Sequence, residues 1–165
     1  MSYYVGIPLM LLAVLLEASV LPMFTINGLQ PDLLLVLLVA WLMVRGANET
    51  FFLAPIGGLL LGLVDHQAMG TALIGLAPLA FLQELRGAQL REGGIVMAVA
   101  FTVAMTVFYN FAYLAVDTLQ GESGDWLEAG SRVIIPTALV NVAVLFPLYL
   151  AILALSRERR QSAYA

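Results

Sequence analysis

The chain has 165 residues, of which 62% are apolar and only 11% charged, and its net charge is −4. With glycine included, the apolar fraction is about 70%, against ~45–50% in soluble domains, so a soluble fold is excluded and a lipid environment is expected. An acidic chain lacks the basic face that nucleic acid requires. Because the sequence has no Cys, no Lys and one His, disulfides, thiolate or multi-histidine metal sites and lysine catalysis are excluded as well. We expect neither a metal nor a cofactor.

Six apolar stretches, separated by short polar or Pro/Gly breaks, predict an all-α integral membrane protein with one six-helix domain over residues 1–165. The expected spans are about 4–24, 29–44, 50–64, 68–85, 94–117 and 131–156. The division within 50–85 is the least obvious. A single helix there would be ~54 Å long against a hydrocarbon core of ~30 Å, so the chain must turn, and Asp65-His66-Gln67 is the polar break available.

Arginine placement favours six spans with both termini in the cytoplasm, because cytoplasmic loops collect basic residues. Under this topology only Arg132 lies outside. The basic residues predicted inside are Arg45, Arg86, Arg91, Arg157, Arg159 and Arg160. Merging 50–85 into one span would divide the seven arginines two against five, which fits the rule less well. The arginine-rich tail is interpreted as an anchor to anionic lipid, with a specific docking role as the alternative.

Each of the first two predicted spans carries one acidic residue, Glu17 in the first and Asp32 at the start of the second. Glu17 is predicted ~10 Å below the outer surface, where a carboxyl is costly. It would be protonated, hydrated, approached by Arg132, or matched by a group on another chain. Pro31 and Asp32 are expected in the first turn of the second span, where proline costs little and an acid complements the helix dipole.

Spans three and four are predicted to form a hairpin rich in small residues. Gly58 and Gly62 form a GxxxG pair, which lets another helix backbone approach closely, and Asp65 lies over the same face. We expect Asp65 to cap the fourth helix, with contact to a partner as the alternative. The neighbouring His66 is interpreted as a loop residue and not as a pH sensor.

Polar residues recur along one face of span five and on span six. At ~100° per residue the span-five set falls within one arc, and span six carries two further residues on one side. The span-five set is Thr102, Thr106, Asn110, Tyr113 and Asp117, and the span-six pair is Thr137 and Asn141. Counting ~1.5 Å per residue places Asn141 at a depth near Thr106 and Asn110, so we predict a contact there. The stripe either joins helices, lines a cavity or receives a partner helix.

The sequence offers one catalytic candidate. Gly121-Glu122-Ser123-Gly124 matches the G-x-S-G motif of rhomboid proteases. It lies in a predicted polar outer loop, and the only histidine precedes Ser123 by 57 positions on a different hairpin. A turn explains the motif better. We therefore expect no catalytic residues and no enzymatic activity.

Three segments carry a family resemblance. They are Gln30-Pro31-Asp32-Leu33, Gly58-Leu59-Leu60-Leu61-Gly62-Leu63-Val64-Asp65, and Gly70 with Gly75. In this order and spacing, in a six-span chain of this length with an Arg-rich tail, the sequence resembles MreD, a membrane protein family of bacterial rod-shape determination.

The resemblance implies a non-catalytic scaffold in the bacterial inner membrane that maintains rod shape and regulates peptidoglycan synthesis. It implies binding to the transmembrane helix of MreC, in a complex with MreB, RodA and its penicillin-binding transpeptidase. The partner helix would enter the small-residue groove of spans three and four, or meet the polar stripe of span five. The cytoplasmic arginines would face MreB or lipid. A second copy of the chain is a further candidate partner.

The MreD family is also similar in fold to the substrate-binding S components of energy-coupling-factor transporters, which supplies the alternative function. An S component would need an Ala-x-x-x-Ala motif in its first helix and a pocket for a small ligand. Span one has Ala13 and Ala18 at a different spacing. The only aromatic and charged group predicted in the outer half is Tyr113, Asp117 and Trp126.

Overall fold

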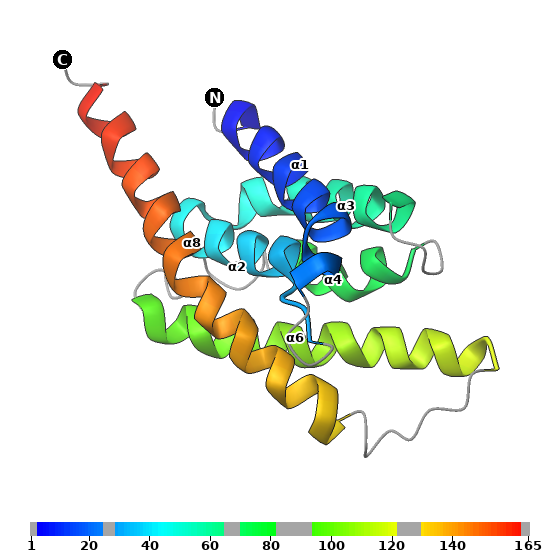
Figure 1. Ribbon diagram of the computed structural model, residues 1–165. Coiled ribbons are helices and arrows are strands. Elements are labelled where there is room, and N and C mark those ends of the chain that lie inside the picture. The colour runs from blue at the N-terminus through cyan, green and yellow to red at the C-terminus, as the bar shows by residue number, and fades with distance from the viewer. Residues whose placement is uncertain (1–2, 25–28, 65–69, 82–93, 122–129, 163–165) are drawn as a thin grey trace.

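The computed structural model describes residues 3–24, 29–64, 70–81, 94–121 and 130–162, and it is built from helices (Figure 1). The expected apolar segments all form helices close to the expected places. In chain order the elements are α1 (Tyr3–Ser19), the 3-10 turn η1 (Leu21–Phe24), α2 (Leu33–Arg45), α3 (Ala47–Val64), α4 (Thr71–Phe81), α6 (Gly94–Leu119), the π-helical turn η3 (Gly130–Ile134) and α8 (Ile135–Ser162).

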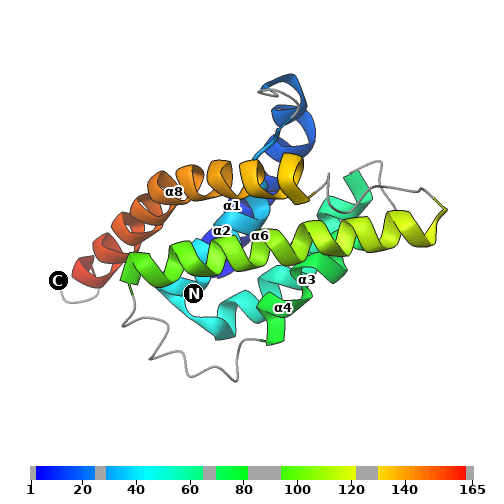
Figure 2. The same cartoon turned by 90° about the horizontal axis from the view of Figure 1, so that it is seen from below.

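Helix α2 forms the core of the bundle. Its sequence is apolar on every side until Arg45, and every residue from Leu34 to Val44 is buried. A helix without a polar face has to be surrounded by other elements. Helices α1, α3, α6 and α8 pack directly against it, and the views from two sides place it between them (Figures 1 and 2).

Four helical segments are long and apolar enough to cross a membrane. These are Tyr4–Met23, Ala47–Val64, Gly94–Leu119 and Arg132–Ser156. Their outward faces carry large exposed apolar side chains, as a lipid-facing surface requires. Helices α2 and α4 are shorter, with 13 and 11 residues. The composition and the fold together define an all-α membrane protein.

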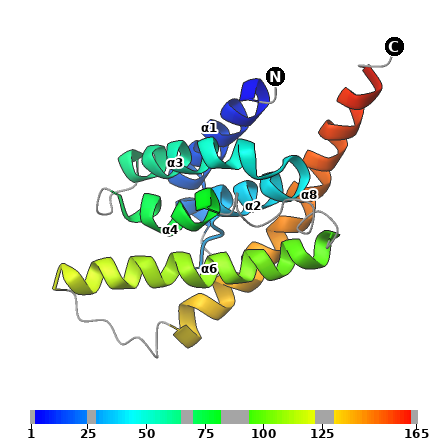
Figure 3. The same cartoon turned by 180° about the vertical axis from the view of Figure 1, so that it is seen from behind.

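Helices α3 and α4 form a closely packed pair, which lies on one side of α2 (Figure 3). A methyl group at Gly58 would lie 3.0 Å from the Cα of Leu73 and 3.3 Å from the Ala72 carbonyl oxygen. At Gly62 it would lie 3.5 Å from the Gly70 nitrogen. The small-residue face predicted from the sequence is therefore covered by α4 of the same chain, so it is not an open groove.

The start of α2 differs from the expectation. Pro31 and Asp32 do not lie in the first helical turn, because α2 begins at Leu33 and Asp32 is the residue before it, with φ −83° and ψ 80°. The Asp32 side chain makes no capping bond to the helix and is held by another helix instead. Asp65, His66, Arg86 and Arg91 lie outside the described residues.

Candidate functional site

A group of polar side chains joins three helices at the start of α2. The side chain of Asn141 on α8 accepts a hydrogen bond from the Asp32 backbone N–H at 2.8 Å and donates one to Asp32 Oδ2 at 2.8 Å. It also donates to Thr106 Oγ1 on α6 at 2.9 Å. Asn141 and Thr106 are fully buried. The predicted contact between Asn141 and this part of α6 is therefore confirmed.

This group lies near the middle of the membrane-spanning region. Thr106 is halfway along the 26-residue helix α6. Helix α2, with 13 residues, is ~20 Å long and cannot cross a ~30 Å hydrocarbon core on its own. Because α2 begins beside Thr106, its N-terminal N–H groups lie at membrane depth, where each must find a partner within the protein.

Glu17 supplies one of these partners. The Leu34 N–H in the first turn of α2 donates to Glu17 Oε2 at 2.7 Å. A carboxylate at this position also complements the positive end of the helix dipole. The alternatives expected for Glu17, namely protonation, hydration, approach by Arg132 or a group on another chain, did not include a helix N-terminus.

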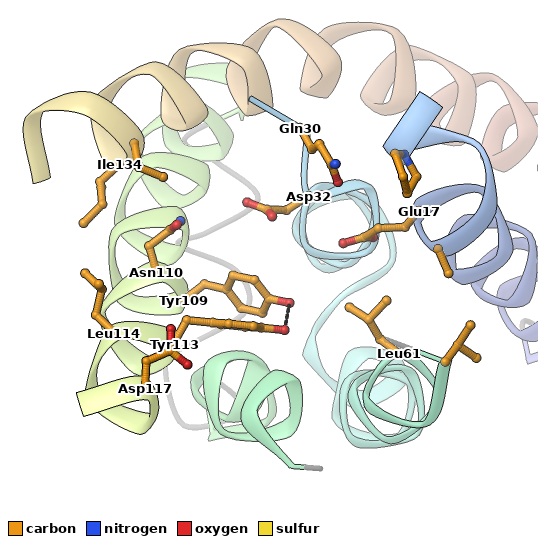
Figure 4. A pocket seen from close by; sticks show the side chains of 14 residues that line it. Glu17, Gln30, Asp32, Leu61, Tyr109, Asn110, Tyr113, Leu114, Asp117 and Ile134 are labelled. Carbon is orange, nitrogen blue, oxygen red and sulfur yellow. Dashed lines mark hydrogen bonds between the residues drawn. The ribbon is translucent and has the colours of Figure 1, made fainter. Parts of the chain in front are cut away.

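A pocket of about 580 Å³ occupies the half of the bundle that α2 does not reach (Figure 4). Its walls are formed by residues from the ends of α1 and α3, from η1, from the segment before α2, from the second half of α6 and from η3. They are Glu17, Ala18, Pro22, Gln30, Asp32, Leu61, Val64, Tyr109, Asn110, Tyr113, Leu114, Asp117, Val133 and Ile134. The pocket therefore follows from the short length of α2.

Two tyrosines on consecutive turns of α6 project into this space (Figure 4). The hydroxyls of Tyr109 and Tyr113 are 3.1 Å apart and hydrogen-bonded, and the ring centroids are 4.8 Å apart. Tyr109 has room for its ring because α4 has a glycine opposite it. A methyl group at Gly75 would lie 2.9 Å from Tyr109 Cε2 and would overlap the neighbouring ring carbon.

The lining chemistry is acidic and aromatic. Glu17, Asp32 and Asp117 contribute three carboxyl groups, and no arginine or lysine is among the described residues that form the walls. In the part of the chain that the structure describes, no three His, Cys, Asp or Glu side chains converge closely enough to hold a metal ion. The walls of the pocket therefore combine carboxyl groups with aromatic and apolar side chains, as the walls of small-molecule pockets do.

The predicted polar stripe on α6 is divided between two environments. Thr102 is fully buried and donates to the Ala98 carbonyl oxygen at 2.9 Å, so it bonds within its own helix. Asn110 donates to the Thr106 carbonyl oxygen at 2.9 Å and lines the pocket, as do Tyr113 and Asp117. On α8, Thr137 is also buried, and it precedes Asn141 by four residues in the sequence.

The basic residues at the ends of α2 and α8 are not among the described residues that line the pocket. Arg45 ends α2 and lies over the Trp41 ring, 5.5 Å from its centroid. Trp41 also donates to Glu49 Oε2 at 3.0 Å. Arg157, Arg159 and Arg160 belong to the last turns of α8, and Ser123 lies outside the described residues.

Sequence reasoning missed Tyr109 and did not bring Glu17 and Asp32 into one site with Tyr113 and Asp117. A signal for Tyr109 was present, since Thr102, Thr106, Tyr109 and Tyr113 follow each other at steps of four, three and four on one helical face. The site therefore holds a larger aromatic and acidic group than the sequence indicated.

The fold and the site together define a helical membrane protein with an acidic internal pocket in one half of its bundle. Comparison with family models, with curated proteins and with solved structures finds no match for this chain.

Proposed function

We propose that this chain is a non-catalytic scaffold of the MreD kind in the bacterial inner membrane, with six membrane-spanning helices and both termini in the cytoplasm. In this role it binds the transmembrane helix of MreC and contributes to the complex of MreB, RodA and its penicillin-binding transpeptidase. Its effect is to maintain rod shape and to regulate peptidoglycan synthesis. The proposal comes from the sequence resemblance, and the points below support it.

The observation that carries the proposal is the use of polar groups within the bundle. Among the described residues, every buried side-chain nitrogen or oxygen has a hydrogen-bond partner. Two residues of the resembling segments hold the bundle together: Asp32 bonds α8 through Asn141, and Gly58 permits the close approach of α4. A rigid helical body of this kind suits a protein that presents helix faces to other membrane proteins.

The arrangement of the chain ends supports the topology. The start of α1 and the end of α8 lie at the same end of the molecule in the views from the front and from behind (Figures 1 and 3). This is expected when the chain crosses the membrane an even number of times. In this topology α2 and α4 are the two short spans, and α2 reaches the cytoplasmic side at Arg45.

The partner helix is expected on an outward apolar face. Gly58 and Gly62 are covered by the α4 hairpin, and the Thr102 and Thr106 part of the polar stripe is buried within the chain, so neither offers an open groove. Asn110 and Tyr113 face the pocket. The remaining surfaces are the lipid-facing sides of α1, α3, α6 and α8. On α3, for example, Phe52, Ile56, Leu59 and Leu63 are exposed at steps of four, three and four.

Site-specific photo-crosslinking tests the proposal and locates the interface. A photoreactive residue is placed at one exposed position on each outer helix, namely Leu15, Leu59, Phe108 or Leu139, with the fully buried Leu38 as the matched control. The chain is produced together with MreC from the same organism. Crosslinks to MreC from one or two adjacent helices, and none from Leu38, are expected. Failure of MreC to crosslink at any position and to copurify in mild detergent would refute the proposal.

The pocket favours a second candidate, the small-molecule-binding subunit of a membrane transporter. A scaffold has no obvious need for a polar cavity of about 580 Å³, whereas a binding subunit depends on one. The two candidates make different predictions for the purified protein. A transporter subunit is expected to copurify with a small ligand and a transport module, and a scaffold is expected to copurify with MreC.

A further inference from the structure

We propose that the pocket between α1, α3, α6 and η3 binds a small organic cation, with Tyr109, Tyr113 and Asp117 as its principal contacts. This inference goes beyond the scaffold proposal and assigns a ligand class to the pocket under either candidate function. It stands on the existence of the cavity, its size, its charge and its aromatic surface.

The cavity is a consequence of the backbone. The N-terminus of α2 lies at the level of Thr106, so α2 does not extend into the other half of the bundle. The volume between the second half of α6 and the ends of α1 and α3 therefore has no central helix. A polar cavity at membrane depth is costly unless it holds water or a ligand that its polar groups can bind. Its volume of about 580 Å³ falls within the ~300–1,000 Å³ range of small-molecule sites.

The charge of the walls selects the sign of the ligand. Glu17, Asp32 and Asp117 bring a formal charge of three negative units, and no basic residue is found among the described lining residues. The N-terminus of α2 contributes only about half a positive charge, which acts on Glu17 through the Leu34 N–H. The formal charge of the described lining residues is therefore negative, which disfavours phosphates and carboxylates and favours a cation.

The geometry of the walls indicates an organic cation. The carboxyl groups are spread over the pocket, and they form no group of three that could hold a metal ion in the described part of the chain. A cation with an apolar body would instead contact Leu61, Val64 and Leu114 while its charge faces the carboxylates. The tilted rings of Tyr109 and Tyr113 add aromatic faces of the kind that bind ammonium groups.

The carboxylate of Asp32 keeps capacity for a ligand. It receives the Asn141 amide on Oδ2. A carboxylate has about four acceptor positions, so this bond does not saturate it. Asp117, half-buried on the wall formed by α6, is the carboxylate whose removal disturbs the helix contacts described above least.

Binding is tested on the full chain, purified in mild detergent, by calorimetric titration and by thermal stabilisation. The cationic probes are choline, tetraethylammonium and thiamine, and the matched probes are neutral riboflavin and anionic biotin. At least one cation is expected to bind saturably at one site per chain, and biotin is expected not to bind. The affinity for that cation is expected to fall about tenfold or more in Asp117→Asn and measurably in Tyr113→Phe.

The control variant is Glu49→Gln, a carboxylate-to-amide change whose product still offers Trp41 an acceptor oxygen, at a site that does not line the pocket. It is expected to bind the cation as the unmodified chain does. The inference is overturned if no cation in the series binds saturably, if biotin binds better than the cations, or if Asp117→Asn and Glu49→Gln have the same affinity. Loss of cation binding with normal MreC crosslinking would refute this inference alone and leave the scaffold proposal standing.

Discussion

Replacement of Asn141 by leucine is the most direct test of how the bundle is held together. The asparagine side chain makes three hydrogen bonds, to the Asp32 backbone N–H, to Asp32 Oδ2 and to Thr106 Oγ1. Leucine has a similar volume and fills the same space without making any of them. The perturbation therefore removes polar contacts among α2, α6 and α8 and leaves the apolar packing nearly unchanged.

The expected loss of stability follows from these contacts. Three interhelical hydrogen bonds at ~0.6 kcal/mol each set a lower limit of about 2 kcal/mol. The Asp32 backbone N–H left without this partner adds up to about 3 kcal/mol. The Asp32 carboxylate adds less, because it lines the pocket. The Thr106 hydroxyl adds less, because a threonine can bond the carbonyl four residues earlier in its own helix. We expect Asn141→Leu to lower the free energy of unfolding by about 2–5 kcal/mol.

The measurement is unfolding of the detergent-purified chain by increasing SDS, followed by the fluorescence of buried Trp41 and by circular dichroism. Asn110→Leu is the matched control. Its side chain donates to a carbonyl oxygen of its own helix and is only half-buried, so a loss below about 1 kcal/mol is expected. Equal losses for the two variants would show that the Asn141 contacts do not join the helices, and the account of the bundle given above would fail.

Three further predictions use the same unfolding assay. Glu17→Leu leaves the N-terminus of α2 without its carboxylate acceptor and is expected to lower the free energy of unfolding by about 1–3 kcal/mol. Glu17→Gln retains an acceptor oxygen and is expected to lower it less, so equal losses would contradict this role. Gly75→Ala is expected to cost about 1–3 kcal/mol because the new methyl meets the Tyr109 ring, and Tyr109→Leu in the same chain is expected to recover most of the loss; no recovery would exclude this cause. Gly58→Ala is expected to destabilise by a similar amount, because its methyl meets the α4 backbone at 3.0 Å, while Gly62→Ala, with ordinary contact at 3.5 Å, is expected to be neutral or stabilising; the reverse order would contradict the packing of α3 on α4.

The helices could be predicted from the sequence because lipid imposes a simple rule on the chain. Long apolar segments must form helices at membrane depth, and the breaks between them contain the polar residues. The Asn141 contact with Thr106 was also predictable, since depth along two antiparallel helices follows from the rise per residue. Both predictions depend on distances along single helices.

The pocket could not be predicted in the same way, because it depends on where α2 begins relative to its neighbours. The sequence pattern predicted Pro31 and Asp32 inside the first turn of the helix, whereas α2 begins at Leu33. A difference of a few residues moves the N-terminus of α2 by several ångströms along its axis. That shift decides whether Glu17 meets a helix end and whether an open volume lies beside Tyr109.

The GxxxG pair shows a different limit of sequence reasoning. The spacing of Gly58 and Gly62 correctly indicated a face that a helix can approach closely, and α4 does so. A sequence pattern of this kind carries no information on whether the approaching helix belongs to the same chain. Chain connectivity favours the adjacent helix, since the hairpin brings α4 beside α3 at a low entropic cost.

The short length of α2 links the stability of the bundle to the proposed binding site. The end of α2 at membrane depth requires acceptors, and Glu17 supplies one, while the Asp32 side chain beside it is held by Asn141 of α8. The same two carboxyl groups then face the volume that α2 leaves open, so they contribute negative charge to the pocket as a consequence of their structural role. Variants of Asp32 or Glu17 therefore change folding and binding together, whereas Asp117 and Tyr113 on the wall of α6 report on binding. A cation that binds in this pocket would also partly neutralise the charge that accumulates around the end of α2, so saturation with it is expected to stabilise the bundle against SDS, and less so in Asp117→Asn.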